Sequence, residues 1–502
     1  MSSSITEAGE YDTLLPQGQP DRKSRRRRTL AIVTLCISIV TAVDFGFFLV
    51  LIPLTRVYEI IICFNYYSSV DPGIIGPGGF IAEKLCKVEP VQSELAFVRG
   101  YEVFFMSLPS VILAVPYGMM ADKWGRKPVL LLSIFGMILA ITFMMMVCWF
   151  SESFPLRFVW ISWSFNIIGG GPAVAMAMVL TIAADVVAEK QRATVFFQVA
   201  VGALLAQTFA TLLASAFMER SEPWTSIFVG YIIGVAACCI AFFIPETLKY
   251  KNQTEDGPID GMEIRDCLDR SDSDVVWKGA LQKFHVVVQE TWAIVIQDWR
   301  LFALLITFFI NSISTALSSI ILQYISARYD WTVAQAGFLL SLRSGANVVL
   351  FVLILPFFTW MLSTKFELGS QRKDLWLARV SILFLPTGFI MIGLAQTPGV
   401  AGLGLMITTL GTGYSSLVRS LVTSMTEPHH VARLYTAVTV FDTLGSLISG
   451  PILAVLYQWG MRLGGGWIGM PFFVAGILTG LTAVLLWLVN ISNVLSGVEM
   501  AI

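Results

Sequence analysis

The sequence predicts an all-α membrane protein with twelve transmembrane helices in two six-helix bundles. The composition is 56% hydrophobic and only 13% charged, with a mean hydropathy of +0.74, whereas soluble domains carry about a quarter charged residues. Twelve apolar runs are long enough to cross a hydrocarbon core of about 30 Å, and one long polar stretch divides them into two sets of six. The surface is therefore expected to face the lipid bilayer. A net charge of −1 without a basic stripe argues against a nucleic-acid partner.

The apolar runs follow one another in chain order. The first is too long for the core of a signal peptide, and no small-residue cleavage site follows it, so we expect it to be retained as a helix. The predicted spans lie near residues 30–54, 95–121, 128–149, 156–183, 194–217, 225–246, 300–325, 333–362, 375–395, 398–425, 431–458 and 467–490.

Basic residues set the predicted orientation. Of the 33 Lys and Arg residues, 22 lie in the N-terminal tail and in the loops that join even to odd spans, and 8 lie in or beside the opposite loops. Because basic residues favour the cytosolic side, both tails, 1–28 and 491–502, are expected in the cytosol. Residues 1–28 are polar and end in a basic cluster, which predicts a disordered tail.

The long polar stretch defines the predicted domains. Residues 29–247 and 300–490 are expected to form the two bundles, and residues 248–299 a central cytosolic loop. Within this loop, apolar residues recur at helical spacing over 276–295, which indicates an amphipathic helix on the membrane surface. A linker helix without lipid contact is the alternative.

The fourth and tenth predicted spans carry an internal repeat. At an offset of 242 residues they share a glycine cluster, a threonine and an acidic residue, followed by an arginine that slips by one position. The first set is Gly169, Thr181, Asp185 and Arg192, and the second is Gly411, Thr423, Glu427 and Arg433. Two related halves follow from this match.

The loop between the second and third spans carries the most specific motif. Residues 118–128 read Gly-Met-Met-Ala-Asp-Lys-Trp-Gly-Arg-Lys-Pro, a G-x-x-x-D-x-x-G-R-K pattern between two long apolar runs. Together with the twelve spans, the central loop and Pro245-Glu246-Thr247, it resembles the major facilitator superfamily over about residues 29–490. Residues 44–46 and 53–59 look similar to fungal metabolite and drug efflux members, and also to the proton-coupled folate transporter branch.

The residues of this motif suit a conformational latch at the cytosolic surface. Asp122 can face the positive end of a neighbouring helix dipole, Arg126 is expected to reach Asp185, and Gly118 and Gly125 allow close helix approach and a sharp turn. The predicted latch comprises Gly118, Asp122, Gly125, Arg126, Lys127, Asp185, Arg192, Glu427 and Arg433. Exposed ion pairs contribute only about 0–1 kcal/mol each, so such a latch biases alternating access without supplying energy for transport. A charge cluster that only fixes the topology is the alternative.

Polar and ionisable residues inside the spans are candidates for proton coupling or substrate binding, because a charge in the membrane is seldom kept without a role. Asp44 and Glu102 are predicted at similar depth in the first two spans, where two neighbouring carboxyl groups are suited to carry protons. The full set is Asp44, Glu102, Arg343, Asn347, Arg419 and Asp442. Static pairing, such as that of Asp442 with Arg419, is the alternative.

Two features of proton-coupled members of the family are missing. The fifth span lacks the Gly-Pro motif usual in antiporters, and Phe165 stands where an arginine is expected four residues before Gly169. No catalytic constellation, phosphate loop or metal-ligand spacing is present, so the sequence predicts a transporter rather than an enzyme, with no cofactor and no metal.

Two of the seven cysteines share a predicted outer loop at 55–94. We expect a disulfide between these two, Cys63 and Cys86, because the outer face is oxidising. The other five lie in spans or in the cytosolic loop.

Three functions are consistent with these observations. The first is a monomeric secondary transporter of the plasma membrane that exports a small organic metabolite or drug against proton influx. The second is a proton-coupled importer of an organic anion or nutrient, favoured by the missing Gly-Pro motif and by Arg343 and Arg419. The third is a non-transporting sensor, which the short tails disfavour.

Overall fold

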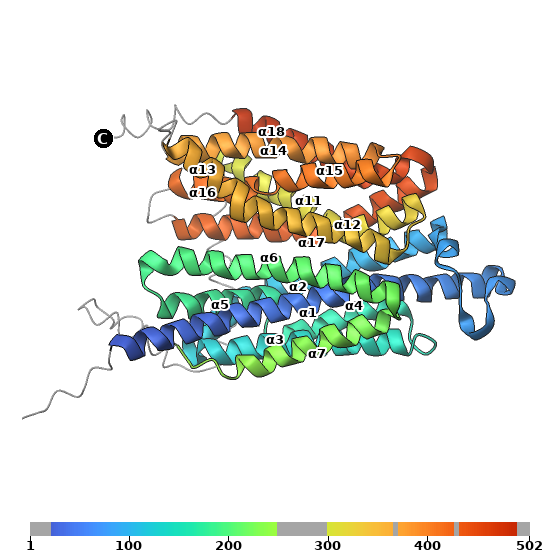
Figure 1. Cartoon of the computed structure of the whole chain (residues 1–502), viewed down its shortest axis with the longest axis horizontal. Helices are drawn as coiled ribbons and strands as arrows, with labels where there is room; N and C mark the ends of the chain where they lie inside the picture. Colours follow the sequence, from blue (N-terminus) through green and yellow to red (C-terminus); the bar gives the residue numbers. More distant parts are fainter. Residues whose placement is uncertain (1–21, 248–298, 365–369, 426–430, 489–502) are drawn as a thin grey trace, which may run out of the picture.

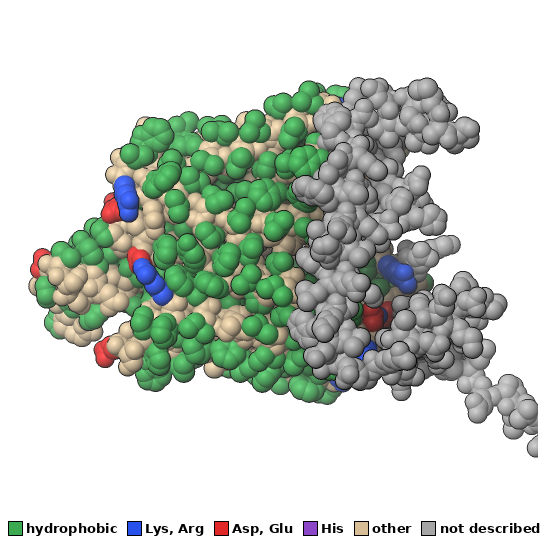
Figure 2. Space-filling model, turned by 180° about the vertical axis from the view of Figure 1, so that it is seen from behind, with side chains coloured by type: hydrophobic (Ala, Val, Ile, Leu, Met, Phe, Trp, Pro, Cys, Tyr) green, Lys and Arg blue, Asp and Glu red, His purple; other side chains and the backbone are tan. Residues whose placement is uncertain are grey.

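The computed structural model describes residues 22–247, 299–364, 370–425 and 431–488. These residues form helices, with no strand among them, in two groups stacked side by side (Figure 1). The predicted amphipathic helix at 276–295 lies outside the described residues. Figure 2 shows one face covered over its middle by hydrophobic side chains, with the visible charged side chains near the ends, as a lipid-facing surface requires.

The first half contains six crossings. They are α1 (Arg22–Val70), α2 (Glu89–Trp124), α3 (Arg126–Trp149), α4 (Val159–Ser162) followed by α5 (Gly171–Val186), α6 (Glu189–Arg220) and α7 (Pro223–Ala241). α1 packs extensively against α6 and α7 and also contacts α2 and α5. Three short 3-10 turns connect α1 to α2, at Pro72–Ile74, Pro77–Gly79 and Glu83–Lys87.

The second half repeats this plan. Its crossings are α11 (Trp299–Tyr329), α12 (Val333–Val349) continuing through a π-helical turn into α13 (Leu355–Thr364), α14 (Ser370–Leu394), α15 (Pro398–Gly411) followed by α16 (Tyr414–Met425), α17 (Val431–Leu463) and α18 (Met470–Leu488). α14 packs against α15, α16 and α18, and α11 packs against α17. The predicted architecture of twelve helices in two bundles is thus confirmed.

Two of the twelve crossings are interrupted at glycines. Among the described residues, eleven segments are long and apolar enough to span a membrane, and the tenth crossing is divided between α15 and α16 at Thr412 and Gly413. The fourth is divided at Gly169–Gly171, whose φ values of 99°, 81° and 71° favour glycine. The offset of 242 residues equates these two breaks, so the repeat seen in the sequence is a repeated interruption of a helix.

The first helix is longer than predicted. The sequence indicates a span at 30–54 and a loop at 55–94, whereas α1 continues to Val70 and α2 begins at Glu89. Arg56 and Glu59 interrupt the apolar run, but they form an ion pair one turn apart, with 2.6 Å between Nη1 and Oε2. The helix therefore continues with these charges paired and buried.

The halves meet along two helix pairs, α2 with α17 and α6 with α12. At the first crossing, a Cβ on Gly100 would lie 2.5 Å from the carbonyl oxygen of Gly450 and 2.7 Å from the Cβ of Ala454. A Cβ on Gly450 would collide with the Gly100 carbonyl oxygen in turn. The two backbones are in direct contact, which only glycine permits.

Candidate functional site

The two ends of the bundle need names, because the functional residues divide between them. We call the end that holds Cys63, Cys86 and the turns at 72–87 the disulfide end, at the right in Figure 1. The end that holds Asp122 and the start of α3 is the Asp122 end.

A cavity of about 490 Å³ lies between the halves. Its volume falls in the range of small-molecule sites, about 300–1,000 Å³. The wall contributed by the first half is mostly apolar, with Phe47, Phe48, Val50, Leu51, Leu54, Val103, Met106, Ile141, Met144 and Trp163 beside Arg99, Glu102, Gln207 and Thr211. The wall contributed by the second half is mostly polar, with Ser312, Thr315, Ser318, Ser319, Arg343, Ser344, Asn347, Thr412 and Ser446 beside Ala316 and Leu340.

Glu102 is buried at this cavity beside a cation. Nη1 of Arg99, one turn earlier in α2, lies 2.7 Å from Glu102 Oε2, and the Tyr58 hydroxyl donates to Oε1 over 3.4 Å. Sequence reasoning misses Arg99 because it lies near the end of an apolar run. Its i, i+3 spacing from Glu102 is the signal that could have found it. The pair has no net charge.

Arg343 lies on the opposite wall and has no acidic partner among the described residues. Its Nη1 donates to Ser318 Oγ over 2.9 Å, whereas its buried Nε has no hydrogen-bond partner. Asn347, one turn later, lines the same cavity, and its Oδ1 accepts a hydrogen bond from Thr412 Oγ1 over 3.0 Å. The cavity is therefore lined by a cation that no acidic side chain of the described residues neutralises.

Asp44 lines a second pocket of about 230 Å³ inside the first half, and within the described part of the chain it makes no ion pair or hydrogen bond. The expected approach of Asp44 to Glu102 is wrong. Glu102 contacts Tyr58, which lies fourteen positions beyond Asp44 in α1, a rise of about 21 Å. Phe47, Phe48 and Met106 line both spaces, so the pocket adjoins the central cavity.

Arg419 and Asp442 do not line the central cavity. Arg419 is exposed on α16, where its guanidinium lies 5.7 Å from the centre of the Phe308 ring. Asp442 accepts a hydrogen bond from Ser312 Oγ. The alternative interpretation, a static pair of Arg419 with Asp442, is not found among the described residues, where Arg419 lies against Phe308 and Asp442 against Ser312.

At the Asp122 end, Arg126 pairs with two acids. Its Nη1 lies 2.5 Å from Asp122 Oδ1, and its Nε lies 3.6 Å from Asp185 Oδ2. Thr247 Oγ1 also donates to Asp185 over 3.3 Å. Arg126 is buried, whereas the Asp122 side chain is 69% exposed.

Glu246 also belongs to this cluster, although the latch predicted from the sequence does not include it. Its two carboxylate oxygens accept the backbone N–H groups of Arg126 and Lys127, over 3.0 and 3.1 Å, at the start of α3, where helix N–H groups lack partners. Lys127 Nζ donates to the Phe242 carbonyl over 2.7 Å. Gly125, with φ of 111°, allows this approach, since a Cβ there would collide with the Glu246 carboxylate.

Two residues of the expected latch differ from the prediction, and two more cannot be compared with it. A Cβ on Gly118 would meet no atom within 4 Å, so close helix approach at this glycine is a wrong expectation for this conformation. Arg192 is not part of the ion-pair cluster, because its Nε donates to the Ala184 carbonyl over 3.2 Å. Glu427 and the side chain of Arg433 lie outside the described residues.

Loss of the Glu246 carboxylate is expected to destabilise the protein. In Glu246→Gln one oxygen becomes an amide nitrogen, which donates rather than accepts, so one N–H at the start of α3 loses its partner. We expect the free energy of unfolding to fall by about 1–3 kcal/mol. Thermal unfolding of purified protein measures this, with the exposed Glu219→Gln as the control. Equal unfolding temperatures for the two variants would show that Glu246 does not stabilise the start of α3.

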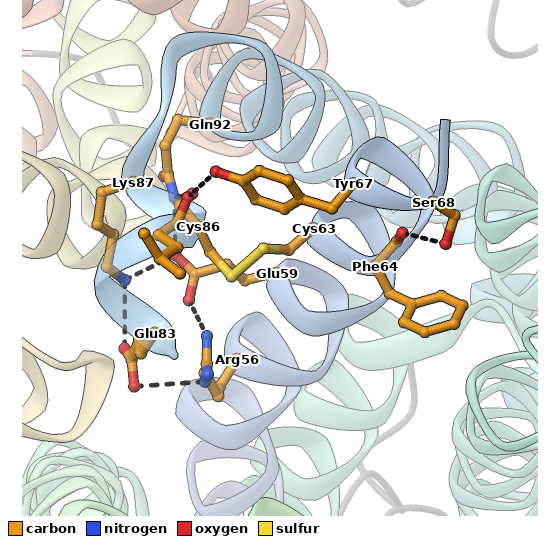
Figure 3. The surroundings of a disulfide bond; sticks show 11 residues. Arg56, Glu59, Cys63, Phe64, Tyr67, Ser68, Glu83, Cys86, Lys87 and Gln92 are labelled. Carbon is orange, nitrogen blue, oxygen red and sulfur yellow. Dashed lines mark hydrogen bonds and ion pairs between the residues drawn. A yellow bond between two sulfur atoms is a disulfide. The ribbon is translucent and has the colours of Figure 1, made fainter. Parts of the chain in front are cut away.

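At the disulfide end, the bond between Cys63 and Cys86 joins α1 to the turn before α2, with a Cα–Cα distance of 5.4 Å (Figure 3). Beside it, the buried carboxylate of Glu59 accepts three hydrogen bonds. The donors are Arg56 Nη1 at 2.6 Å, Lys87 Nζ at 2.6 Å and Gln92 Nε2 at 2.7 Å. The network attaches the end of the connecting segment and the start of α2 to α1.

Glu83 carries this network across to the second half. It lies 3.4 Å from Arg56 and 3.2 Å from Lys87, and its Oε1 accepts the backbone N–H of Val333, the first residue of α12, over 2.7 Å. Further bonds between the halves run from Gln323 Nε2 to the Gln92 carbonyl and from Gln458 Nε2 to the Ser93 carbonyl, at 2.6 and 3.0 Å. These contacts close the halves against each other at the disulfide end.

The protein has two halves of six helices, which enclose a central cavity and meet at one end. This architecture is that of the secondary membrane transporters that are built from structural repeats. Residues 98–450 match the Major Facilitator Superfamily. The chain belongs to this family of transporters, which are not enzymes.

The relatives and solved structures that resemble the chain agree with this assignment. It is 32% identical to the MFS efflux pump atnC of Emericella nidulans, over 97% of this chain and 94% of that protein. It is 31% identical to the efflux pump ustT of Aspergillus flavus, over 87% and 83%. The human organic anion transporter MFSD10 has a similar fold, with a TM-score of 0.53 and 16% identity over 93% of this chain and 100% of that one.

Proposed function

We propose that this protein exports a small organic metabolite or drug across the plasma membrane in exchange for protons, as a monomer with both termini in the cytosol. The central cavity carries the proposal, because its apolar wall and few polar groups suit an organic molecule of drug size. Similarity to atnC and ustT, both named efflux pumps, favours export over import.

The orientation rests on charge and on redox chemistry. Basic residues are concentrated on the side of the Asp122 end, which the positive-inside tendency assigns to the cytosol. The disulfide then lies outside, where disulfides persist. Closure at the disulfide end corresponds to an inward-facing conformation, in which a cytosolic molecule enters the cavity.

Asp44 is the proposed proton carrier. Its carboxyl group has no ion-pair partner in the described part of the chain, and its pocket adjoins the central cavity. A proton bound there can therefore respond to occupancy of the cavity through the shared residues Phe47, Phe48 and Met106. Glu102 is less suited to this role, because its carboxylate is already engaged in an ion pair with Arg99.

The ion pairs of Arg126 are proposed to act as the latch. Asp122, Arg126 and Asp185 come from α2, α3 and α5 and lie at one surface. In the outward-facing state this surface must close, and the exposed Asp122 is free to contact the second half. The cluster then biases the two states without driving transport.

Import of an organic anion is the second candidate function, because Arg343 offers the cavity a cation that has no acidic partner among the described residues. Import and export move the substrate in opposite directions, so one accumulation experiment distinguishes these two functions.

Accumulation of labelled compounds in cells tests the proposal, with and without a protonophore. We expect cells with the wild-type protein to accumulate less compound than cells without it, and the protonophore to remove this difference. In cells with Asp44→Asn, accumulation is expected to equal that of cells without the protein. The matched control is Asp330→Asn, which changes an exposed residue with φ of 53° that asparagine tolerates. Greater accumulation at acidic external pH, lost in Asp44→Asn, would establish import instead.

A further inference from the structure

We infer that the substrate is an amphipathic monoacid, whose carboxylate binds Arg343 and whose apolar body packs against the wall formed by α1, α2 and α3. The inference deepens the proposed function and rests on it, since it takes the central cavity as the substrate site.

The hydrogen bonding of Arg343 is incomplete. Its guanidinium has one hydrogen bond, to Ser318, and its buried Nε has none. The residue as a whole is only partly buried and lines the cavity, so its terminal N–H groups can donate to an anion there. The planar guanidinium presents its N–H groups as a fork that matches the two oxygens of a carboxylate.

The charge of the cavity favours one acidic group on the ligand. Its ionisable lining residues are Arg99, Glu102 and Arg343, and the first two neutralise each other at 2.7 Å. One positive charge remains. The carboxylate of Asp442 lies behind the wall, where Ser312 donates to it, and is not among the lining residues. A second acidic group on the substrate would find no cation.

The remaining walls orient such a molecule. The hydroxyl groups of Thr315, Ser319 and Ser344 and the amide of Asn347 line the same cavity as Arg343 and can hydrogen-bond further polar groups of the molecule. The opposite wall offers aromatic and methionine side chains, among them Phe47 and Met106, which suit an apolar body of variable shape. The acid anchor and the apolar wall belong to different halves, so the bound molecule bridges the elements that move against each other.

Binding to the purified full-length protein in nanodiscs tests the inference without any gradient. The probes are matched sets, each an aromatic acid with its methyl ester and primary amide: 1-naphthylacetic, 4-biphenylacetic and 9-anthracenecarboxylic acid. Affinity is measured from Trp fluorescence and thermal stabilisation. Because a charge-assisted hydrogen bond is lost with the ester, we expect the acids to bind at least about tenfold tighter than their esters.

Variants of Arg343 assign this preference to the residue. In Arg343→Gln, acid and ester are expected to bind equally, with ester affinity as in the wild type, which also shows that the variant is folded. Arg343→Lys is expected to keep part of the preference, and Arg419→Gln, which changes an arginine outside the cavity, to keep all of it. Arg343→Lys remains informative if Arg343→Gln does not fold.

Three results would overturn the inference: esters that bind the wild type as tightly as acids, a preference that survives in Arg343→Gln, or no acid in the panel that binds. Failure of the proposed function would look different. Acids would then bind with the expected dependence on Arg343, yet cells would show no protonophore-sensitive export.

Discussion

Gly450→Val is expected to abolish transport while the protein still reaches the membrane. The α2–α17 crossing brings the backbones of Gly100 and Gly450 into contact, and a side chain at 450 would collide with the Gly100 carbonyl and meet the Val103 Cβ at 3.0 Å. Overpacking of such a contact costs about 1–3 kcal/mol. Because the proposed outward-facing state separates the halves at the disulfide end, we expect the cost to fall on the inward-facing state and to shift the protein toward the outward-facing one.

Cysteine accessibility measures this shift. A reporter in the central cavity, Thr315→Cys, is labelled with an impermeant maleimide from outside the cell. We expect faster labelling in the Gly450→Val background than in the wild type. Gly234→Val is the control, since a Cβ at Gly234 would meet nothing within 4 Å. Unchanged labelling together with normal transport would show that the crossing is not a gate.

Glu59→Gln is expected to cause the largest loss of stability among the substitutions considered for the disulfide end. The carboxylate compensates the buried cations Arg56 and Lys87. Removal of one partner from a buried ionic network leaves uncompensated charge, which costs about 3–5 kcal/mol. The network also holds Glu83 against the start of α12, so closure of the halves is expected to weaken as well.

Thermal unfolding of the purified protein checks the effect of Glu59→Gln. The matched control is Glu94→Gln, which breaks the exposed pair with Arg157 at 3.0 Å, a loss of about 0–1 kcal/mol. If the two variants unfold at the same temperature, the network is not the structural element described above.

Local spacing accounts for the parts of the site that the sequence predicts. Asp122 and Arg126 belong to one short motif and pair across the turn at Gly125, between the end of α2 and the start of α3. Arg343 and Asn347, four positions apart, line one cavity. The twelve spans follow from hydropathy, because lipid leaves little choice of structure to an apolar run of that length.

Two kinds of prediction fail for physical reasons: the depth of a residue within the membrane, and contacts between residues far apart in the sequence. The end of α1 is hidden because Arg56 and Glu59 look like loop residues until they pair. That pairing adds sixteen helical residues, 55–70, to the assumed span, so depths counted from span ends are wrong, and Asp44 and Glu102 are expected together although they lie apart. Glu83 and Val333, joined across 250 positions, have no local signal at all.

Exchange of substrate for protons is tested most directly in proteoliposomes that hold a pH dye. Purified protein is reconstituted, the vesicle lumen is made acidic relative to the outside, and a compound identified as exported in the cell assay is added outside. The proposed mechanism predicts proton movement that starts with addition of the compound, runs opposite to it and is absent in Asp44→Asn. Transport of the compound without proton movement, or with protons moving in the same direction, would contradict it.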